Sequence, residues 1–220
     1  DVYLDLNENE IVGLIGPNGA GKTTLLNAMS GLVKPESGAL TLFGKAERWP
    51  KPHQLVTHGI SRTLQGVGLF SDLTVLENVM IGAHKFSAAG LGRALLGRTA
   101  KDERVLRERA MLALERVYAG ALANRRAGTL AYPDTKRVAI ARAYVTKPAI
   151  IIADEPTGNL DPALSVGIMK LLDRINREGT TVLMATHDSG IVDQMRKRVI
   201  ELDGGTVIRD QARGVYGYTG

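Results

Sequence analysis

The chain has 220 residues, of which 44% are hydrophobic, so it is long and apolar enough for one domain with a buried core, which excludes a disordered polypeptide. It has no cysteine, which excludes a disulfide framework and a thiolate metal site. The longest wholly apolar run, residues 149–153, is far shorter than the roughly 18 residues of a membrane-spanning helix.

Basic residues exceed acidic residues by 28 to 23. Much of the excess lies in residues 93–126, with a smaller cluster at Arg196, Lys197 and Arg198. A run of this kind is usually a solvated face. Nucleic acid and anionic lipid headgroups are the alternative partners for such a surface, and of these we expect no nucleic acid.

Short apolar runs alternate with helical stretches along the chain, which indicates an α/β fold with a largely parallel sheet. Residues 11–16, 149–154 and 180–186 are continuously apolar, as central strands covered on both faces should be. We therefore predict that these three segments form the centre of the sheet.

Between the first two strands, from about residue 73 to residue 118, the pattern is helical. Its apolar stripe consists of Leu106, Ala110, Ala113, Leu114 and Val117. We interpret this segment as a helical lobe inserted into the α/β core, and ordinary crossover helices lying on the sheet are the alternative. Within a single domain, residues 1–72 and 136–220 then form the core and residues 73–135 the lobe.

The segment GPNGAGKTT follows the first predicted strand, precedes the predicted helix KTTLLNAMS, and matches the pattern G-x-x-x-x-G-K followed by Ser or Thr. Its glycines let successive backbone N–H groups point at phosphates from a helix N-terminus. Lys22 is expected to reach the β- and γ-phosphates and Thr23 to ligate Mg²⁺. A glycine-rich turn that binds nothing is the alternative. The predicted nucleotide-binding residues are Gly16, Pro17, Asn18, Gly19, Ala20, Gly21, Lys22, Thr23 and Thr24.

Two acids end the predicted strand at residues 149–154. Asp154 is placed to hold Mg²⁺ through water, and Glu155 to orient or deprotonate an attacking water. Paired acids after a strand are often structural, but together with a phosphate loop they indicate phosphoryl-transfer chemistry. Gln65 and His187 would by themselves be a surface residue and a loop residue, and this context favours functional roles for both.

Together these motifs resemble the ATP-binding subunits of ABC transporters. GPNGAGKTT is similar to the Walker A motif, IIIADE to the Walker B motif and GNLD, with Asp161, to the D-loop. Gln65 resembles the Q-loop glutamine and His187 the switch histidine. The ordered set extends over nearly the whole chain.

The resemblance implies a P-loop NTPase with a RecA-like, mostly parallel sheet, antiparallel strands on the N-terminal side and an inserted helical subdomain. It implies ATP and Mg²⁺ as cofactors, with Thr23, Gln65 and Asp154 at the metal. Glu155, His187 and Gln65 would be catalytic, and Asp161 would lie at the nucleotide. It also implies a head-to-tail homodimer or heterodimer, a membrane permease partner, and a peripheral position on the cytoplasmic face of the cell membrane.

Two branches of the family are resembled. GLIGPNGAGKTTLLNAMSGLVKPESG, ISRTLQ and LTVLENVMIGAH are similar to the ATPases of branched-chain amino-acid importers (the LivG type), whereas the chain from Arg137 onward is similar to the cell-division ATPase FtsE. The resemblance implies transport, and a nucleotide-dependent scaffold acting in cell division is the alternative. We hypothesise that the chain is a hybrid, natural or engineered.

The family carries L-S-G-G-Q or L-S-Y-G-D-Q just before the helix R-x-x-I-A-R-A, where this chain has LAYPDT, residues 130–135. The resemblance implies that the serine hydroxyl and glycine N–H groups of this signature contact the γ-phosphate held by the partner subunit. Ala131, Pro133 and Thr135 replace the serine, the second glycine and the glutamine. Because proline has no N–H, we expect weakened dimer closure and hydrolysis with ATP capture intact. Pro133 followed by Asp134 also predicts a helix start.

The family has an upstream strand and an aromatic residue that stacks on adenine, and the first residues here, DVYLDLNENEIVG, are expected to lie partway into that first sheet; Tyr3 is not assigned the stacking role. A GTPase or small-molecule kinase is a further alternative. It is disfavoured because no N-K-x-D motif is present and the acids, Asp161 and His187 would be unexplained. A dinucleotide oxidoreductase is disfavoured because no G-x-G-x-x-G follows the first strand.

Overall fold

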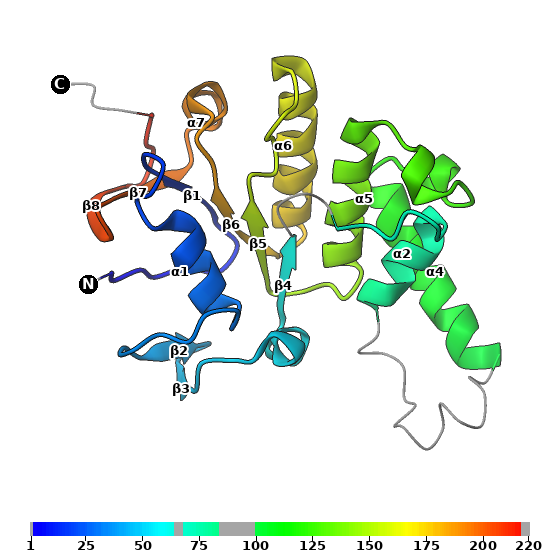
Figure 1. The fold of residues 1–220 in the computed structure, drawn as a ribbon, viewed down its shortest axis with the longest axis horizontal. Helices are drawn as coiled ribbons and strands as arrows, with labels where there is room; N and C mark the ends of the chain where they lie inside the picture. Colours follow the sequence, from blue (N-terminus) through cyan, green and yellow to red (C-terminus); the bar gives the residue numbers. More distant parts are fainter. Residues whose placement is uncertain (1, 64–67, 84–99, 217–220) are drawn as a thin grey trace.

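A computed structural model describes residues 2–63, 68–83 and 100–216 (Figure 1). None of the helices in these ranges is long and apolar enough to cross a bilayer. In the described part of the chain, 3-10 helices occur at Pro52–His58, Gly120–Leu122 and Ala127–Thr129. The other elements, in chain order, are β1 (Ile11–Ile15), α1 (Lys22–Met29), β2 (Leu40–Leu42), β3 (Lys45–Glu47), β4 (Ile60–Thr63), α2 (Val75–Gly82), α4 (Ala100–Arg116), α5 (Tyr132–Tyr144), β5 (Ile150–Asp154), α6 (Pro162–Arg177), β6 (Thr181–Ala185), α7 (Ser189–Met195), β7 (Arg198–Asp203) and β8 (Thr206–Gln211).

The central sheet has six strands in the order β4-β5-β6-β1-β7-β8, and β2 and β3 form a separate antiparallel hairpin. Neighbouring strands pair in parallel except at β7 and β8, which are antiparallel. The three strands predicted from apolar runs are β1, β5 and β6, and they lie next to one another. The predicted mostly parallel α/β fold is confirmed.

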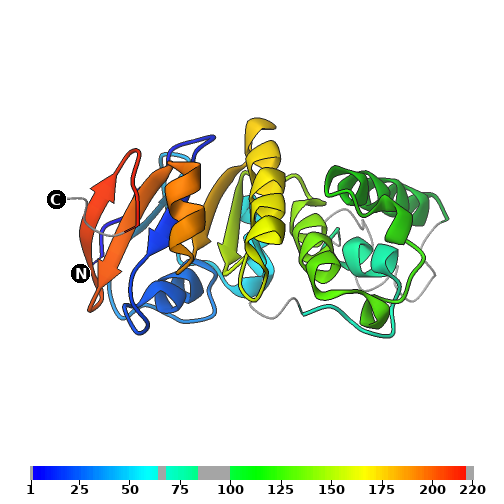
Figure 2. The same ribbon diagram turned by 90° about the horizontal axis from the view of Figure 1, so that it is seen from above.

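Helices cover both faces of the sheet, with α1 on one face and α6 and α7 on the other (Figure 2). Alternate residues of a strand point to opposite faces, so each strand contributes to two cores. Val12 and Leu14 pack in a cluster with Leu26 of α1. Ile11 packs in a second cluster with Leu172 and Ile175 of α6. Burial on both faces explains why these strands are continuously apolar.

The helices α2 and α4 lie beyond the β4 edge of the sheet and not over either face, with α5 beside that edge (Figures 1 and 2). All the residues of the predicted apolar stripe, Leu106, Ala110, Ala113, Leu114 and Val117, are buried. This placement favours a lobe over crossover helices. The boundaries at residues 73 and 135 stay a prediction.

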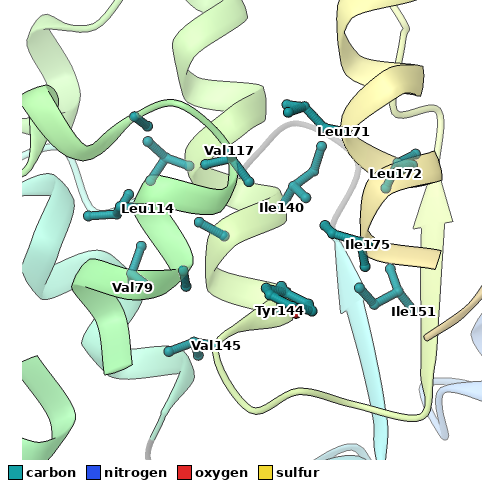
Figure 3. Packing of buried hydrophobic residues seen from close by; sticks show 14 of the residues in the cluster. Val79, Leu114, Val117, Ile140, Tyr144, Val145, Ile151, Leu171, Leu172 and Ile175 are labelled. Atoms are coloured by element: carbon teal, nitrogen blue, oxygen red, sulfur yellow. The ribbon is translucent and has the colours of Figure 1, made fainter. Parts of the chain in front are cut away.

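The apolar core of this helical region continues without interruption into the core of the sheet (Figure 3). Ile140 and Tyr144 of α5 lie between Leu114 on α4 and the α6 residues Leu172 and Ile175. The helical region is therefore held to the sheet mainly by burial of apolar side chains, with α5 as the shared layer.

Polar contacts at the end of α6 reinforce this junction. The Glu178 carboxylate accepts a hydrogen bond from the Tyr144 hydroxyl and pairs with Arg116 Nη1 of α4 at 2.9 Å. Burial, together with the hydrogen bond to Glu178, raises the pKa of Tyr144 to about 12. Arg174 Nη1 of α6 donates to the Tyr118 hydroxyl at 2.8 Å, so α4 and the turn after it are both tied to α6.

Residues 2–10, all of which the structure describes, form no strand, and β1 begins at Ile11. Side chains occupy the backbone groups that a strand would pair. The Asn7 oxygen accepts from Thr181 Oγ1 at 3.1 Å, and the Asp5 oxygen accepts from Arg198 Nη1 at 3.2 Å. Arg198 also pairs with the carboxylates of Asp5, Glu10 and Asp210, which offset its charge within the basic cluster at residues 196–198.

Two leucines of α4 test whether the helical region and the sheet share one apolar core. Leu114 of α4 is fully buried, whereas Leu112 of the same helix is 60% exposed. We expect Leu114→Ala to lower the free energy of unfolding by about 2–5 kcal/mol, because it removes buried methyl groups and leaves a cavity. Leu112→Ala should change it by less than about 0.5 kcal/mol. Urea denaturation of both variants measures the difference, and equal effects would contradict the packing described above.

Candidate functional site

Parallel pairing brings the predicted motifs to one edge of the sheet. The strands β4, β5, β6 and β1 are neighbours, so their carboxyl ends lie side by side. Gly16 directly follows β1, and Asp154 ends β5. His187 is the second residue after β6, next to Thr186. Gln65 lies in residues 64–67, outside the described part of the chain, directly after β4. Segments far apart in the sequence are thereby assembled into one candidate site.

The phosphate loop needs glycine at its first position. Gly16 has φ 143°, and a Cβ there would lie 2.1 Å from the Leu202 main-chain oxygen, so no other residue fits without moving β7. Gly21, with φ 101°, leads into α1, whose first turn contains no acidic residue and has no side-chain cap. The positive end of the α1 dipole is therefore not neutralised from within the helix, which favours an anion there.

Lys22 lies folded across this loop. Its Nζ donates to the main-chain oxygens of Gly16 at 2.7 Å and Pro17 at 3.0 Å, and the residue is buried. The hydroxyl-bearing Thr23 and Thr24 are exposed at the start of α1. An arriving phosphate thus has an ammonium and helix N–H groups available, at the cost of the two Lys22 bonds to carbonyls.

Asp154 is held by Arg62, which is not among the predicted site residues. Arg62 Nη2 of β4 lies 2.9 Å from Asp154 Oδ2, and the two side chains are only 7% and 2% exposed. Arg62 Nη1 donates to Leu26 O at 3.2 Å, Asn27 Oδ1 at 2.8 Å and Ser30 Oγ at 3.1 Å, at the C-terminal end of α1. One guanidinium therefore joins β4, β5 and α1, and its charge complements the negative end of the helix dipole.

Glu155 has a strained backbone, with φ 50°. Its N–H donates to Ala185 O at 3.0 Å, and its main-chain oxygen accepts from Gly158 N at 3.1 Å. The side-chain oxygen Oε1 lies 2.8 Å from His187 Nδ1. The other oxygen, Oε2, is buried and has no hydrogen-bond partner within the described ranges. A buried acceptor without a donor is uncommon and marks a place where a water or ligand is expected.

Asp161 caps the helix α6. Its Oδ1 accepts from Leu164 N at 2.9 Å, a side-chain N-cap. The residue is exposed, so capping leaves it accessible, and its predicted place at the nucleotide stays a prediction.

The departure from the family signature forms the start of α5. Ala131 is the N-cap residue and offers no side-chain cap, and Pro133 lies in the first turn. The N–H groups of Asp134 and Thr135 both donate to Ala131 O, at 3.0 and 3.1 Å. The helix start predicted from Pro133 and Asp134 is confirmed. One amide donor is absent from this segment by covalent structure, and two more are already used inside the helix.

The oxygen ligands at this edge of the sheet suit Mg²⁺ only if a bound phosphate supplies further ligands. Among the residues described, no group of three or more His, Cys, Asp or Glu side chains is arranged to hold a metal ion. Mg²⁺ is usually bound through one or two carboxylates together with substrate phosphates and water. The exposed Thr23 hydroxyl matches that set of ligands, whereas the Asp154 side chain is 2% exposed and paired with Arg62, so it would act on the ion through water. Tyr3, which is not assigned the role of stacking on adenine, is 85% exposed. It makes none of the described hydrogen bonds to the phosphate loop, Asp154 or Glu155.

The ABC transporter family matches residues 1–158 of this sequence. The chain belongs to the ABC transporter family. It is 42% identical over 223 residues to the cell division ATP-binding protein FtsE of Mycobacterium tuberculosis, covering 99% of this chain and 90% of that protein. It is 39% identical over 211 residues to the high-affinity branched-chain amino acid transport ATP-binding protein LivG of Salmonella typhimurium, covering 94% of this chain and 82% of that protein.

Solved ABC structures share the fold. The dimeric post-hydrolysis state of the ATP-binding cassette MJ0796 bound to ADP and Pi matches with a TM-score of 0.79 at 32% identity, covering 99% of this chain and 90% of that one. The resemblance to ABC ATP-binding subunits is thereby confirmed, and the chain is an ATPase domain of the ABC type. Because FtsE and LivG both match over nearly the whole chain, the role in transport or in cell division is not separated by overall similarity.

Removing the buried cation should destabilise the fold. Arg62→Met leaves the Asp154 carboxylate buried without its partner, so we expect the free energy of unfolding to fall by about 3–5 kcal/mol. Arg104→Met, which breaks the exposed i,i+4 pair with Glu108, is the control and should cost less than about 1 kcal/mol.

The double variant Arg62→Met/Asp154→Asn distinguishes the charge from the packing. It should recover part of the loss in chemical denaturation, because no uncompensated carboxylate remains. A double variant no more stable than Arg62→Met would show that the contacts of Arg62 with α1, and not its charge, hold the edge together.

Proposed function

We propose that this ABC ATPase domain binds Mg-ATP and hydrolyses it slowly to drive a membrane permease. The observation that carries the proposal is the Glu155 carboxylate, held by His187 through Oε1 and left with a buried, unpartnered Oε2. A carboxylate oriented in this way is able to accept a proton from a water placed at Oε2. It lies at the same sheet edge as the phosphate loop, where that water would meet a terminal phosphate.

Each of the other groups has a part in this reaction. The α1 N-terminus and Lys22 bind the phosphates once Lys22 releases the oxygens of Gly16 and Pro17. Thr23, Asp154 and Gln65 would hold Mg²⁺, which supplies positive charge against the phosphate oxygens when bound. His187 fixes the orientation of the Glu155 side chain, so that Oε2 points away from the hydrogen bond at Oε1.

We further propose that two ATPase subunits, identical or different, associate head to tail on ATP and act on a permease from the cytoplasmic face of the membrane. The match to a cassette described as dimeric in its ADP and Pi complex supports the dimer. The match to LivG, named for high-affinity branched-chain amino acid transport, supports a permease of that type.

The start of α5 supports slow turnover. Ala131 has no hydroxyl and Pro133 has no N–H, so two donors that a closed dimer would offer to the partner's nucleotide are missing. A hydrogen bond to a charged group is worth about 1.5–3 kcal/mol. Donors that act in a transition state are worth about 100- to 1000-fold in rate. The losses fall on closure and hydrolysis, because the phosphate loop itself is complete.

A second candidate function is a nucleotide-dependent scaffold acting in cell division. It is favoured by the combination of a complete phosphate loop with a donor-poor α5 start, and by the 42% identity to FtsE. In this function ATP binding and association would matter more than turnover.

Restoring the signature tests the account of slow turnover. The triple variant Ala131→Ser, Pro133→Gly, Thr135→Gln should raise steady-state phosphate release at least about tenfold, because each regained donor contributes about that factor. The ATP affinity of the isolated chain should stay unchanged. The same triple variant with Glu155→Gln is the control and should release no phosphate. An unchanged rate would show that the α5 start does not limit hydrolysis.

Light scattering separates the two candidate functions. We expect Glu155→Gln with ATP to dimerise only weakly in the native background and completely when the three signature substitutions are added, because the restored α5 start gains donors toward the partner's nucleotide. A complete ATP-held dimer in the native background, with negligible turnover by the unaltered chain, would instead support the scaffold.

A further inference from the structure

Lys136 of α5 contacts Glu155, the proposed general base, of the same chain. Lys136 lies one turn after Tyr132 on α5 and is only 7% exposed. Its Nζ donates to the main-chain oxygen of Glu155 at 3.0 Å. The same ammonium lies over the Tyr132 ring, 5.4 Å from the ring centroid. Neither the family motifs nor the comparisons give this residue a role.

This ammonium is expensive to bury. None of the ion pairs found in residues 2–63, 68–83 and 100–216 includes Lys136, so its charge is met by a carbonyl and an aromatic face alone. Burying an ammonium without a carboxylate partner costs free energy, and a cation near a helix N-terminus opposes the helix dipole. An apolar side chain would serve folding better at this position. A departure from the choice that folding favours is expected at functional sites.

The contact falls on a strained residue. Glu155 keeps φ 50° only because its surroundings fix it from several sides. The contacts with Ala185, Gly158 and His187 come from β6, the loop after β5 and the loop after β6. Lys136 adds a contact from α5, outside the sheet. It therefore connects the helical region to the backbone that aims the Glu155 carboxylate.

We propose that Lys136 is a positioning residue that couples the start of α5 to Glu155 of the same chain. In the dimer proposed above, the start of α5 faces the nucleotide of the partner subunit, whereas Glu155 serves the nucleotide of its own. When the dimer closes, movement of Tyr132 changes the contact between its ring and the Lys136 ammonium. The ammonium in turn shifts the strained backbone of Glu155, to whose main-chain oxygen it donates. Contact of the α5 start with the partner's nucleotide thereby changes the position of the Glu155 carboxylate at the nucleotide of its own chain. The coupling rests on the proposed function.

The test uses the full chain with Lys136→Met, Lys136→Arg and the control Lys170→Met, which removes an exposed lysine on α6. Mg-ATP affinity is measured by titration, kcat and KM by phosphate release, and the thermal midpoint without nucleotide. Lys136→Met should bind Mg-ATP with the affinity of the unaltered chain and lose about tenfold in kcat, the size of one charge-assisted hydrogen bond. Lys136→Arg should recover part of the loss, and Lys170→Met should lose nothing.

The thermal midpoint distinguishes positioning from a structural role. Glu155 O keeps its bond from Gly158 N, so Lys136→Met orphans no group and removes a buried charge. Its midpoint should be unchanged or higher while kcat falls. A lowered midpoint with a parallel loss of ATP affinity, or an unchanged kcat, would overturn the proposal. If the unaltered chain itself fails to bind Mg-ATP, the proposed function fails, which is a different result.

Discussion

The buried pair of Arg62 and Asp154 holds together the edge of the sheet on which the site depends. At 2.9 Å and with side chains 7% and 2% exposed, these charges are stable only as partners, because either one alone would be left uncompensated in the interior. Arg62 also binds the last turn of α1, whose first turn belongs to the phosphate loop. One guanidinium thus fixes the strand before Gln65, the strand that ends at Asp154 and the helix after the phosphate loop.

Beside this fixed edge the structure places strain where chemistry is proposed. Glu155 has φ 50°, and its Oε2 is buried without a partner in the described residues. Both features oppose folding, and both are consistent with a carboxylate kept in one orientation for a water and a phosphate. Rigid strands on either side supply the restraint, since β5 and β6 are paired up to Asp154 and Ala185.

The sequence was sufficient for the features that depend on local pattern. Apolar runs predicted β1, β5 and β6, and the phosphate loop and paired acids predicted what lies at their carboxyl ends. The course of residues 2–10 was not predictable in this way, because side chains of Thr181 and Arg198, remote in sequence, donate to the main-chain oxygens of Asn7 and Asp5. Arg62 was missed for a similar reason. The strand ISRT is mostly polar and gives no signal of a buried cation, and Asp154 lies far along the chain, so that only the pairing of β4 with β5 brings the two together.

At the start of α5, helix stability and the proposed recognition of a partner's nucleotide make opposite demands on Pro133. Pro133 suits the first turn because its φ is fixed and it lacks the N–H that a helix start leaves unpaired. That missing N–H is the group a phosphate would need. Glycine would return the donor but would also release the backbone, and a proline that fits its site stabilises a fold by about 0.4–1 kcal/mol through the unfolded chain. A stable α5 also holds Lys136 and the core residues Ile140 and Tyr144 in place. Selection for its stability is therefore compatible with weak binding of the partner's phosphate, so that stability of the fold and rate of ATP hydrolysis are not optimised together.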